Sequence, residues 1–401
     1  MKKLYALPIF CLLCFSSFSQ KHSRQCVYPE DSTFELPADF KKYQTGGKSI
    51  VKLPTVVHVI FYDDSQDLPD EYVKDIIHEV NENFRRQTPD TVNTPDAFKP
   101  VAADTEIEFE LATVDPSNEP TNGITHTKSS LEKIQLSQAP FSSTGGHDAW
   151  NTLKYVNIWI VRNPDFLVAG IGISTSPSSH GTPKDGVVIG SFGPYFHKFI
   201  THYLGHYLGL KHPFLYDYYD LSPTDTCYTV PGGPDGLEDT PNQLYSTQAG
   251  TCPDFPVTDI CSPDAPGVMF MNYMDYSGFD CQNMFTQQQD AAMNWVLDSV
   301  RFSLFEPVNS VDENDPYKNM EVHIYPNPFR EKLIIETQSS SFSKKEYGIF
   351  DSMGRPVFTG ILDILPNSKN EINTALMPNG VYFLKIRSGH KIITRRIMKL
   401  K

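Results

Sequence analysis

The stretch THYLGHYLGLKH, Thr201–His212, decides how this chain is interpreted. His202 and His206 are four residues apart, so on a helix both imidazoles project from the same face. Gly209 is able to take the left-handed conformation that ends a helix, which lets His212 turn back toward the other two. Three imidazole nitrogens leave a zinc ion one open position for water, which is typical of a catalytic rather than a structural site.

One position in this stretch lacks the residue that peptide hydrolysis needs. Tyr203 follows the first histidine, where a glutamate would take a proton from the attacking water. Such a base contributes about 10²–10⁴-fold, and a phenol with a reference pKa of about 10 accepts protons poorly at neutral pH. Zinc lowers the pKa of its bound water to about 7, so some nucleophile forms without the base. Two hypotheses stay open: a working zinc enzyme, and a binding protein that keeps its zinc.

Predicted strands and helices alternate along the chain around this stretch. Thr55–Tyr62 is β-branched and nearly continuous, as expected of a buried strand. Pro69–Arg86 places apolar residues at helical spacing and is predicted to be a core-facing amphipathic helix; these residues are Val73, Ile76, Ile77, Val80 and Phe84. Further strands are predicted at Glu106–Ala112, Tyr155–Val161 and Gly186–Gly190, and a helix at Tyr195–Leu210. The pattern predicts an α/β domain, in which His58 of the first strand is interpreted as a structural histidine.

The N-terminus predicts export. Lys2 and Lys3 precede the apolar run LYALPIFCLLCF, and Ser17–Ser19 provides small residues at the cleavage spacing, so residues 1–19 are predicted to be a signal peptide. A membrane anchor is disfavoured because the run is too short to cross a bilayer, and no membrane span is expected. The formal charge of −14 argues against a nucleic-acid partner, which would require a basic face.

The cysteines fit an exported chain, because an oxidising compartment favours disulfides. Five remain after residues 1–19, and four of them lie in one region: Cys227, Cys252, Cys261 and Cys281. Sequence alone allows three pairings of these four. Cys26 stands alone near the new N-terminus.

Two further features of the sequence support a zinc-protease interpretation: a methionine-containing turn and a resemblance to a known family. MNYMDY at 271–276 offers Met274 in a turn, and a long zinc motif followed by such a turn is the metzincin signature. From Leu53 to about Phe302 the chain resembles the pappalysin family of metzincin endopeptidases. The matching pieces are VVHVI at 56–60, GGHDAW at 145–150, YVNIWIV at 155–161, DGVVI at 185–189, the histidine stretch, EDTPNQ at 238–243, NYMDY at 272–276 and CQNMFT at 281–286.

The resemblance implies a metzincin domain over 53–305, with a mixed twisted sheet and a long active-site helix. It implies that His202, His206 and His212 hold Zn²⁺ and that the chain acts on a protein or peptide substrate. Met274 matches the methionine of the turn, and Tyr276 matches a tyrosine that swings toward the reacting centre.

The resemblance also implies two disulfides, a calcium site and a latency segment. It implies the disulfides Cys227–Cys261 and Cys252–Cys281. Asp235 and Thr240 match positions that help bind Ca²⁺ in relatives, although that match is short. Ser23–Cys26 resembles a latency segment, in which a cysteine of the 20–52 propeptide takes the fourth zinc position; an unpaired surface thiol is the alternative for Cys26.

The chain departs from the family at two positions. Tyr203 replaces the catalytic glutamate, so the resemblance leaves hydrolysis open and a catalytically inactive pseudoprotease becomes the alternative. Phe279 replaces an aspartate that relatives cleaving before basic residues hold in the specificity pocket, so a basic preference is not carried over.

The C-terminal part has a different charge. Residues 321–401 hold 13 Lys and Arg against 7 Asp and Glu, a formal charge of +6, so residues 1–320 carry a formal charge of −20. The polar, acidic residues 306–320 between the two parts are predicted to be a linker. YPNPF at 325–329 and four later segments are interpreted as short strands. Residues 321–401 resemble the C-terminal sorting domain of bacterial type IX secretion, a small all-β sandwich, with an adhesive β-module as the alternative. The resemblance implies the type IX machinery as a partner and an extracellular or cell-surface location.

Overall fold

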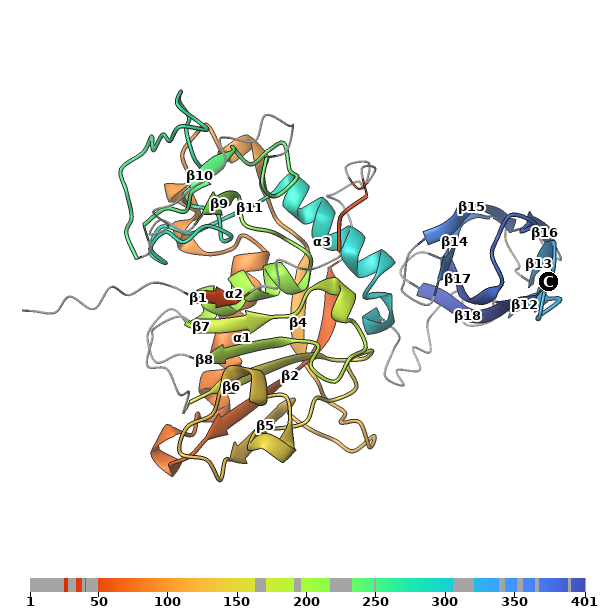
Figure 1. Ribbon diagram of the computed structural model, residues 1–401, viewed down its shortest axis with the longest axis horizontal. Helices are drawn as coiled ribbons and strands as arrows, with labels where there is room; N and C mark the ends of the chain where they lie inside the picture. The colour runs from red at the N-terminus through yellow and green to blue at the C-terminus, as the bar shows by residue number, and fades with distance from the viewer. Residues whose placement is uncertain are drawn as a thin grey trace, which may run out of the picture.

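The computed structural model describes residues 25–27, 34–37, 40, 50–162, 171–190, 196–216, 233–248, 250–305, 321–338, 343–351, 356–364, 368–388 and 391–400. These residues form an α/β unit built on one mixed sheet and a C-terminal all-β sandwich (Figure 1). The predicted fold class is confirmed. Within the described residues, no helix is both long enough and apolar enough to cross a membrane.

The central sheet is mixed. Its strand order is β1-β7-β8-β6-β2-β4, and β5 also pairs with β2. The bounds are β1 Gln25–Val27, β2 Val51–Phe61, β4 Ile107–Leu111, β5 Ile124–Lys128, β6 Val156–Val161, β7 Ile171–Ser174 and β8 Val187–Gly190. All these pairings are parallel except β7 with β8, which is antiparallel. β1 therefore lies beside β7 at one edge of the sheet.

Helices cover the sheet where the apolar periodicity predicts. The helices are α1 Asp70–Phe84, α2 Phe196–Tyr207 and α3 Gln287–Ser299. All five predicted apolar positions of α1 are buried, so its core-facing side is confirmed. α2 packs against α1 and against β7 and β8. Thr286 begins α3 with a capping box, in which its hydroxyl accepts a hydrogen bond from Gln289 N.

Short elements complete the α/β unit. Two small sheets pair β3 (Ala102–Ala103) with β11 (Phe285–Thr286) and β9 (Phe214–Tyr216) with β10 (Gln243–Tyr245). The 3₁₀ helices are η2 Asp64–Gln66, η3 Pro89–Asn93, η4 Lys99–Val101, η5 Leu136–Gln138, η6 Ser142–Thr144, η7 Pro177–Ser179 and η8 Phe302–Phe305.

The predicted histidine helix extended too far. Tyr195 lies outside the described residues, and α2 ends at Tyr207 rather than at Leu210. Gly209 has φ of +92°, the left-handed conformation expected of it, and Leu210 N donates a hydrogen bond back to Gly205 O. The chain therefore turns three residues earlier than the apolar pattern alone suggests.

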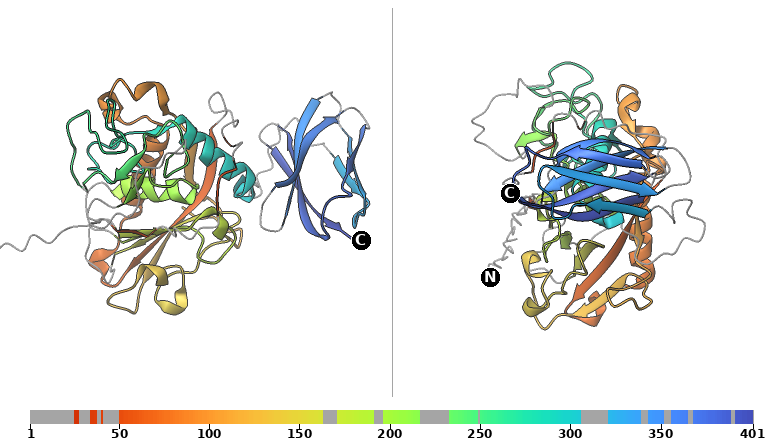
Figure 2. Two further views of the ribbon diagram at one scale, coloured as in Figure 1. Left: turned by 45° about the horizontal axis from the view of Figure 1, so that its top comes forward. Right: turned by 90° about the vertical axis from the view of Figure 1, so that its right-hand side faces the viewer.

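The C-terminal sandwich packs a three-stranded sheet against a four-stranded sheet (Figure 2). The first contains β12 (Glu321–Tyr325), β13 (Lys332–Gln338) and β16 (Ser368–Asn373), and the second contains β15 (Pro356–Ile364), β14 (Ser343–Asp351), β17 (Gly380–Ser388) and β18 (Lys391–Lys399). Leu333 and Ile335 of one sheet share an apolar core with Ile349 and Ile386 of the other. The interpretation of 325–329 as a strand was wrong, because β12 ends at Tyr325 and proline has no N–H to donate to a strand ladder.

Candidate metal centre

The structure brings His202, His206 and His212 to one point. Their Nε2 atoms are 3.2 Å apart for 202 and 206, 3.0 Å for 206 and 212, and 3.3 Å for 202 and 212. His202 and His206 come from α2, and the chain reversal at Gly209 returns His212 to them. Among the residues that the structure describes, this is the only group of three or more His, Cys, Asp or Glu side chains with ligand atoms close enough to hold a metal.

Two of the imidazoles have their tautomers fixed by backbone carbonyls. His202 Nδ1 donates to Tyr273 O at 2.7 Å, and His206 Nδ1 donates to Leu210 O at 2.8 Å. Because a carbonyl only accepts, each Nδ1 carries the proton and each Nε2 presents a lone pair to the shared point. A cation at that point would satisfy lone pairs that otherwise face one another in a buried place.

The geometry fits zinc. Tetrahedral zinc with bonds to nitrogen of about 2.0–2.1 Å separates its ligand nitrogens by roughly 3.3–3.4 Å, close to the observed spacing. Burial lowers the pKa of His206 to about 4, and burial together with the other two histidines lowers the pKa of His212 well below its usual value. Both shifts favour the neutral imidazole, which is the form that binds metal.

Side chains from neighbouring elements pack closely against α2. Gly205 faces Met274, and a Cβ at residue 205 would lie 2.5 Å from Met274 Sδ, so a larger residue there would displace the methionine side chain. On another side Thr201 Oγ1 accepts a hydrogen bond from Asn83 Nδ2, whose Oδ1 accepts one from the Tyr273 hydroxyl. The buried Met274 therefore packs against α2 at Gly205, between His202 and His206 in sequence.

Tyr203 is buried next to the histidine cluster. Its side chain is 1% exposed and belongs to the main apolar core. Its ring centroid lies 5.3 Å from that of His202 and 6.3 Å from that of His206. Ser174 of β7 donates a hydrogen bond to Tyr203 O at 2.9 Å, which fastens this turn of the helix to the sheet.

Tyr276 lies beside the histidines. Its ring centroid is 5.0 Å from that of His212 and 5.9 Å from that of His202. Phe214 of β9 stacks on His212 with ring centroids 4.7 Å apart and meets Tyr276 edge-on at 4.9 Å. The histidine cluster is thus bordered by aromatic rings on this side.

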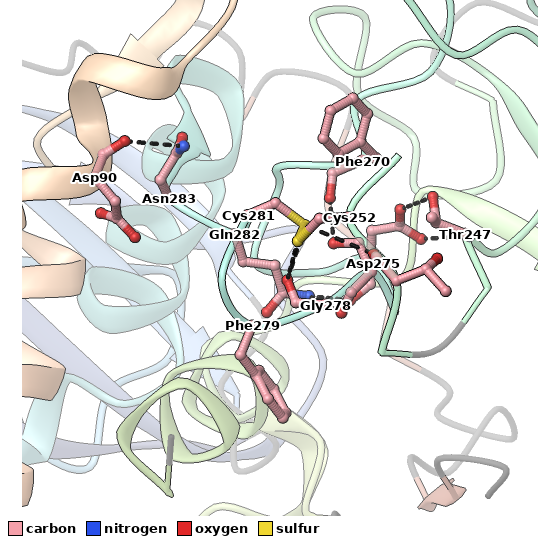
Figure 3. Close-up of a disulfide and its surroundings, with 12 residues drawn as sticks. Asp90, Thr247, Cys252, Phe270, Asp275, Gly278, Phe279, Cys281, Gln282 and Asn283 are labelled. Carbon is pink, nitrogen blue, oxygen red and sulfur yellow. Dashed lines mark hydrogen bonds between the residues drawn. A yellow bond between two sulfur atoms is a disulfide. The ribbon is translucent and has the colours of Figure 1, made fainter. Parts of the chain in front are cut away.

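A disulfide closes the loop that follows Tyr276. Cys252 and Cys281 are bonded, as one of the expected pairings requires, and the Phe279 ring points away from the bond (Figure 3). Phe279 packs edge-on against Phe199 of α2 with ring centroids 4.3 Å apart. Cys261 is also disulfide-bonded, while its expected partner Cys227 lies outside the described residues.

Sequence reasoning missed a lysine that joins this loop to α2. The Lys198 ammonium donates to Phe279 O and Gln282 O, each at 2.7 Å, and forms an ion pair with Asp90 at 2.7 Å. Lys198 is 5% exposed. Its position four residues before His202 was the only available signal, because its partners lie about 80 or more residues away in sequence.

The remaining predicted site residues lie apart from the histidines or are only partly described. Asp235 is buried; its carboxylate accepts hydrogen bonds from Thr240 Oγ1 at 2.7 Å and Leu237 N at 3.1 Å, and burial raises its pKa to about 8. The backbone of Cys26 pairs in β1 with Gly172 of β7. His58 binds Thr125 and Asn157 inside the sheet, consistent with a structural role.

Comparisons with known proteins agree with this geometry. The family model described as Pregnancy-associated plasma protein-A matches residues 142–298, and that of the Secretion system C-terminal sorting domain matches residues 323–400. Mature mirolysin of Tannerella forsythia, solved with a cleaved peptide, is 37% identical with a TM-score of 0.56; the match covers 64% of this chain and 96% of mirolysin. A promirolysin mutant of the same organism is 36% identical with a TM-score of 0.56, covering 66% and 88%. No curated protein matches the sequence.

Proposed function

The chain belongs to the pappalysin family of metzincin metallopeptidases and ends in a type IX sorting domain, and from this premise we propose that it is an exported zinc protein that binds peptides but hydrolyses them weakly or not at all. Family and sorting domain together make it a secreted metallopeptidase by descent, delivered to the cell surface or the extracellular space. Tyr203 is the residue that argues against hydrolysis.

His202, His206 and His212 would hold the zinc, which, when bound, supplies a polarised water and a Lewis acid for a peptide carbonyl. The observation that supports this assignment is the convergence of three Nε2 atoms, two of them with lone pairs fixed by carbonyls. The Tyr276 ring borders the same centre.

Tyr203 stands where a general base is required. A carboxylate there would take a proton from water and pass it to the departing amine, whereas a phenol is protonated at neutral pH and accepts poorly. The Tyr203 ring is almost completely buried, so this side chain also lacks the solvent access of a proton shuttle. The alternative, a working endopeptidase, requires another group to act as the base.

Processing and calcium complete the proposal. We assign residues 1–19 to a signal peptide, 20–52 to a propeptide in which Cys26 is the zinc ligand of the latent form, 53–305 to the metallopeptidase domain, and 306–320 to a linker before the sorting domain. Asp235 and Thr240 are proposed to contribute to a calcium site, since a buried carboxylate there lies beside a hydroxyl.

The decisive experiment compares the wild type with Tyr203→Glu, using residues 53–305 so that latency is not mistaken for inactivity. Zinc content is matched, and cleavage of an unstructured protein is followed by mass spectrometry. We expect a gain of roughly 10²–10⁴-fold, the contribution of a general base. Tyr203→Gln is the matched control, because an amide of similar shape to glutamate cannot accept the proton. Ordinary protease rates in the wild type, unchanged by Tyr203→Glu, would sink the proposal.

A further inference from the structure

Strand β7 places a glycine directly against the ring of Tyr203. Gly172 is buried, pairs with Ile189 of β8, and does not have a left-handed φ. A glycine inside a strand weakens it and often marks a point where another group approaches closely. Here the group is an aromatic ring, since a Cβ on residue 172 would lie 2.5 Å from Tyr203 Cε2 and 2.7 Å from Cζ.

Strand β7 contacts residue 203 at a second point, through Ser174. Ser174 lies two residues further along β7, and alternate residues of a strand face the same side. Its hydroxyl donates to Tyr203 O at 2.9 Å. One face of β7 therefore provides both an anchor for the Tyr203 backbone and a space for its ring.

We propose that Gly172 and Tyr203 are a matched pair, in which the glycine provides the space that the ring fills, so that position 203 is built for an aromatic ring and not for a carboxylate. Carbon atoms in contact lie about 3.5–4.0 Å apart, so an alanine at 172 would overlap the ring by roughly 1 Å. Neither a paired strand nor a ring in a close-packed core gives way by that much without cost.

Gly172 thereby becomes a positioning residue of the metal centre. It determines where the side chain that follows the first histidine lies, and it makes the tyrosine part of the local packing rather than an isolated replacement. A glutamate at 203 would leave part of the ring's space empty beside Gly172. The inference rests on packing, so it stands whether or not the chain hydrolyses peptides.

The test is a double-mutant cycle read by thermal unfolding of the zinc-loaded full chain. Glycine and alanine at 172 are each combined with tyrosine, phenylalanine and glutamate at 203. Overpacking typically costs about 1–3 kcal/mol, so Gly172→Ala should lower the Tm by roughly 2–12 °C when residue 203 is tyrosine. The same loss is expected with phenylalanine, which keeps Cε2 and Cζ. With glutamate most of the loss should disappear, because the only tight contact left is with Ile189 Cδ1, 3.0 Å from the added Cβ.

Ser174→Ala serves as the control, since it removes a hydrogen bond to the backbone and should lower the Tm equally in all three backgrounds. If Gly172→Ala fails to fold with tyrosine or phenylalanine but folds with glutamate, the pair is supported. An equal Tm shift in all three backgrounds, or failure to fold in all three, would refute it. Zinc content is measured for each variant, so a loss of metal is not mistaken for a packing effect.

Discussion

Arg301, which follows α3, contacts the C-terminal end of α2 at Tyr207 and forms a buried ion pair with Asp185. Its guanidinium binds both carboxylate oxygens of Asp185, at 2.7 and 3.0 Å, and both side chains are fully buried. Arg301 Nε also donates to Tyr207 O at 2.9 Å, and the guanidinium carbon lies 3.4 Å from the Tyr207 ring centroid. Burial alone would raise the pKa of Asp185, but Arg301 and His180 lower it to about 2.

Arg301→Met should therefore be strongly destabilising. It leaves a buried carboxylate without its counter-charge, an effect that typically costs 3–5 kcal/mol. For a domain of this size about 2–4 °C of Tm corresponds to each kcal/mol, so thermal unfolding at neutral pH should shift by roughly 6–20 °C. Lys74→Met is the matched control, because the Lys74–Glu71 pair is exposed and should contribute about 0–1 kcal/mol.

The pH dependence provides a second reading of the same pair. The folded pKa of Asp185 is depressed, so its stabilisation is present above the unfolded value of 3.8 and is lost as pH falls through about 2. Arg301→Met should remove this part of the acid sensitivity. A loss below about 1 kcal/mol at neutral pH, together with an unchanged acid limb, would refute the argument that the pair stabilises the end of α2.

Three further outcomes are expected. His206→Ala should lower zinc from about one per chain to a small fraction by elemental analysis, and stoichiometric zinc in a triple alanine variant of the cluster would contradict the assignment. In the full chain, Cys26 should resist thiol reagents until zinc is chelated, because a metal-bound thiolate is masked; rapid alkylation with zinc bound would make it an ordinary thiol. Burial lowers the pKa of His126, but hydrogen bonds to Asp67 and Asp70 outweigh it and leave it raised. The stabilisation from His126 is full below its unfolded pKa and is lost as pH rises through its folded pKa. His126→Gln should therefore lose more stability near about pH 5.5 than near about pH 8.5, and the difference should be under about 1 kcal/mol for so exposed a group. Equal losses of stability at the two pH values would contradict this prediction.

The sequence predicts the parts of this molecule that follow from local periodicity. α1 buries every apolar position expected of it, and the strands around β2 and β6 begin within a few residues of their predicted bounds. The histidine cluster is predictable for the same reason, because helical spacing and one glycine fix the relative positions of its three imidazoles.

The residues that the sequence does not reveal act over long separations. β7 is four residues long and contains Gly172 and Ser174 between and after two isoleucines, so it carries no clear strand signal, yet it contacts Tyr203 twice. Asp185 and Arg301 are 116 residues apart, and only the fold pairs them. Such contacts depend on tertiary packing, which no local pattern encodes.

The metal centre has a structural reason to persist without hydrolysis. His202 and His206 are almost completely buried, and their Nδ1 protons are committed to the carbonyls of Tyr273 and Leu210. Those carbonyls lie in the methionine turn and in the reversal after α2, so a cation at the Nε2 atoms would link both segments to the helix. Removing it would leave buried lone pairs facing one another, a cost that falls on folding rather than on catalysis. Under the proposal that Tyr203 replaces the general base, a bound metal would still contribute to folding, and the packing of Tyr203 on Gly172 is compatible with that role.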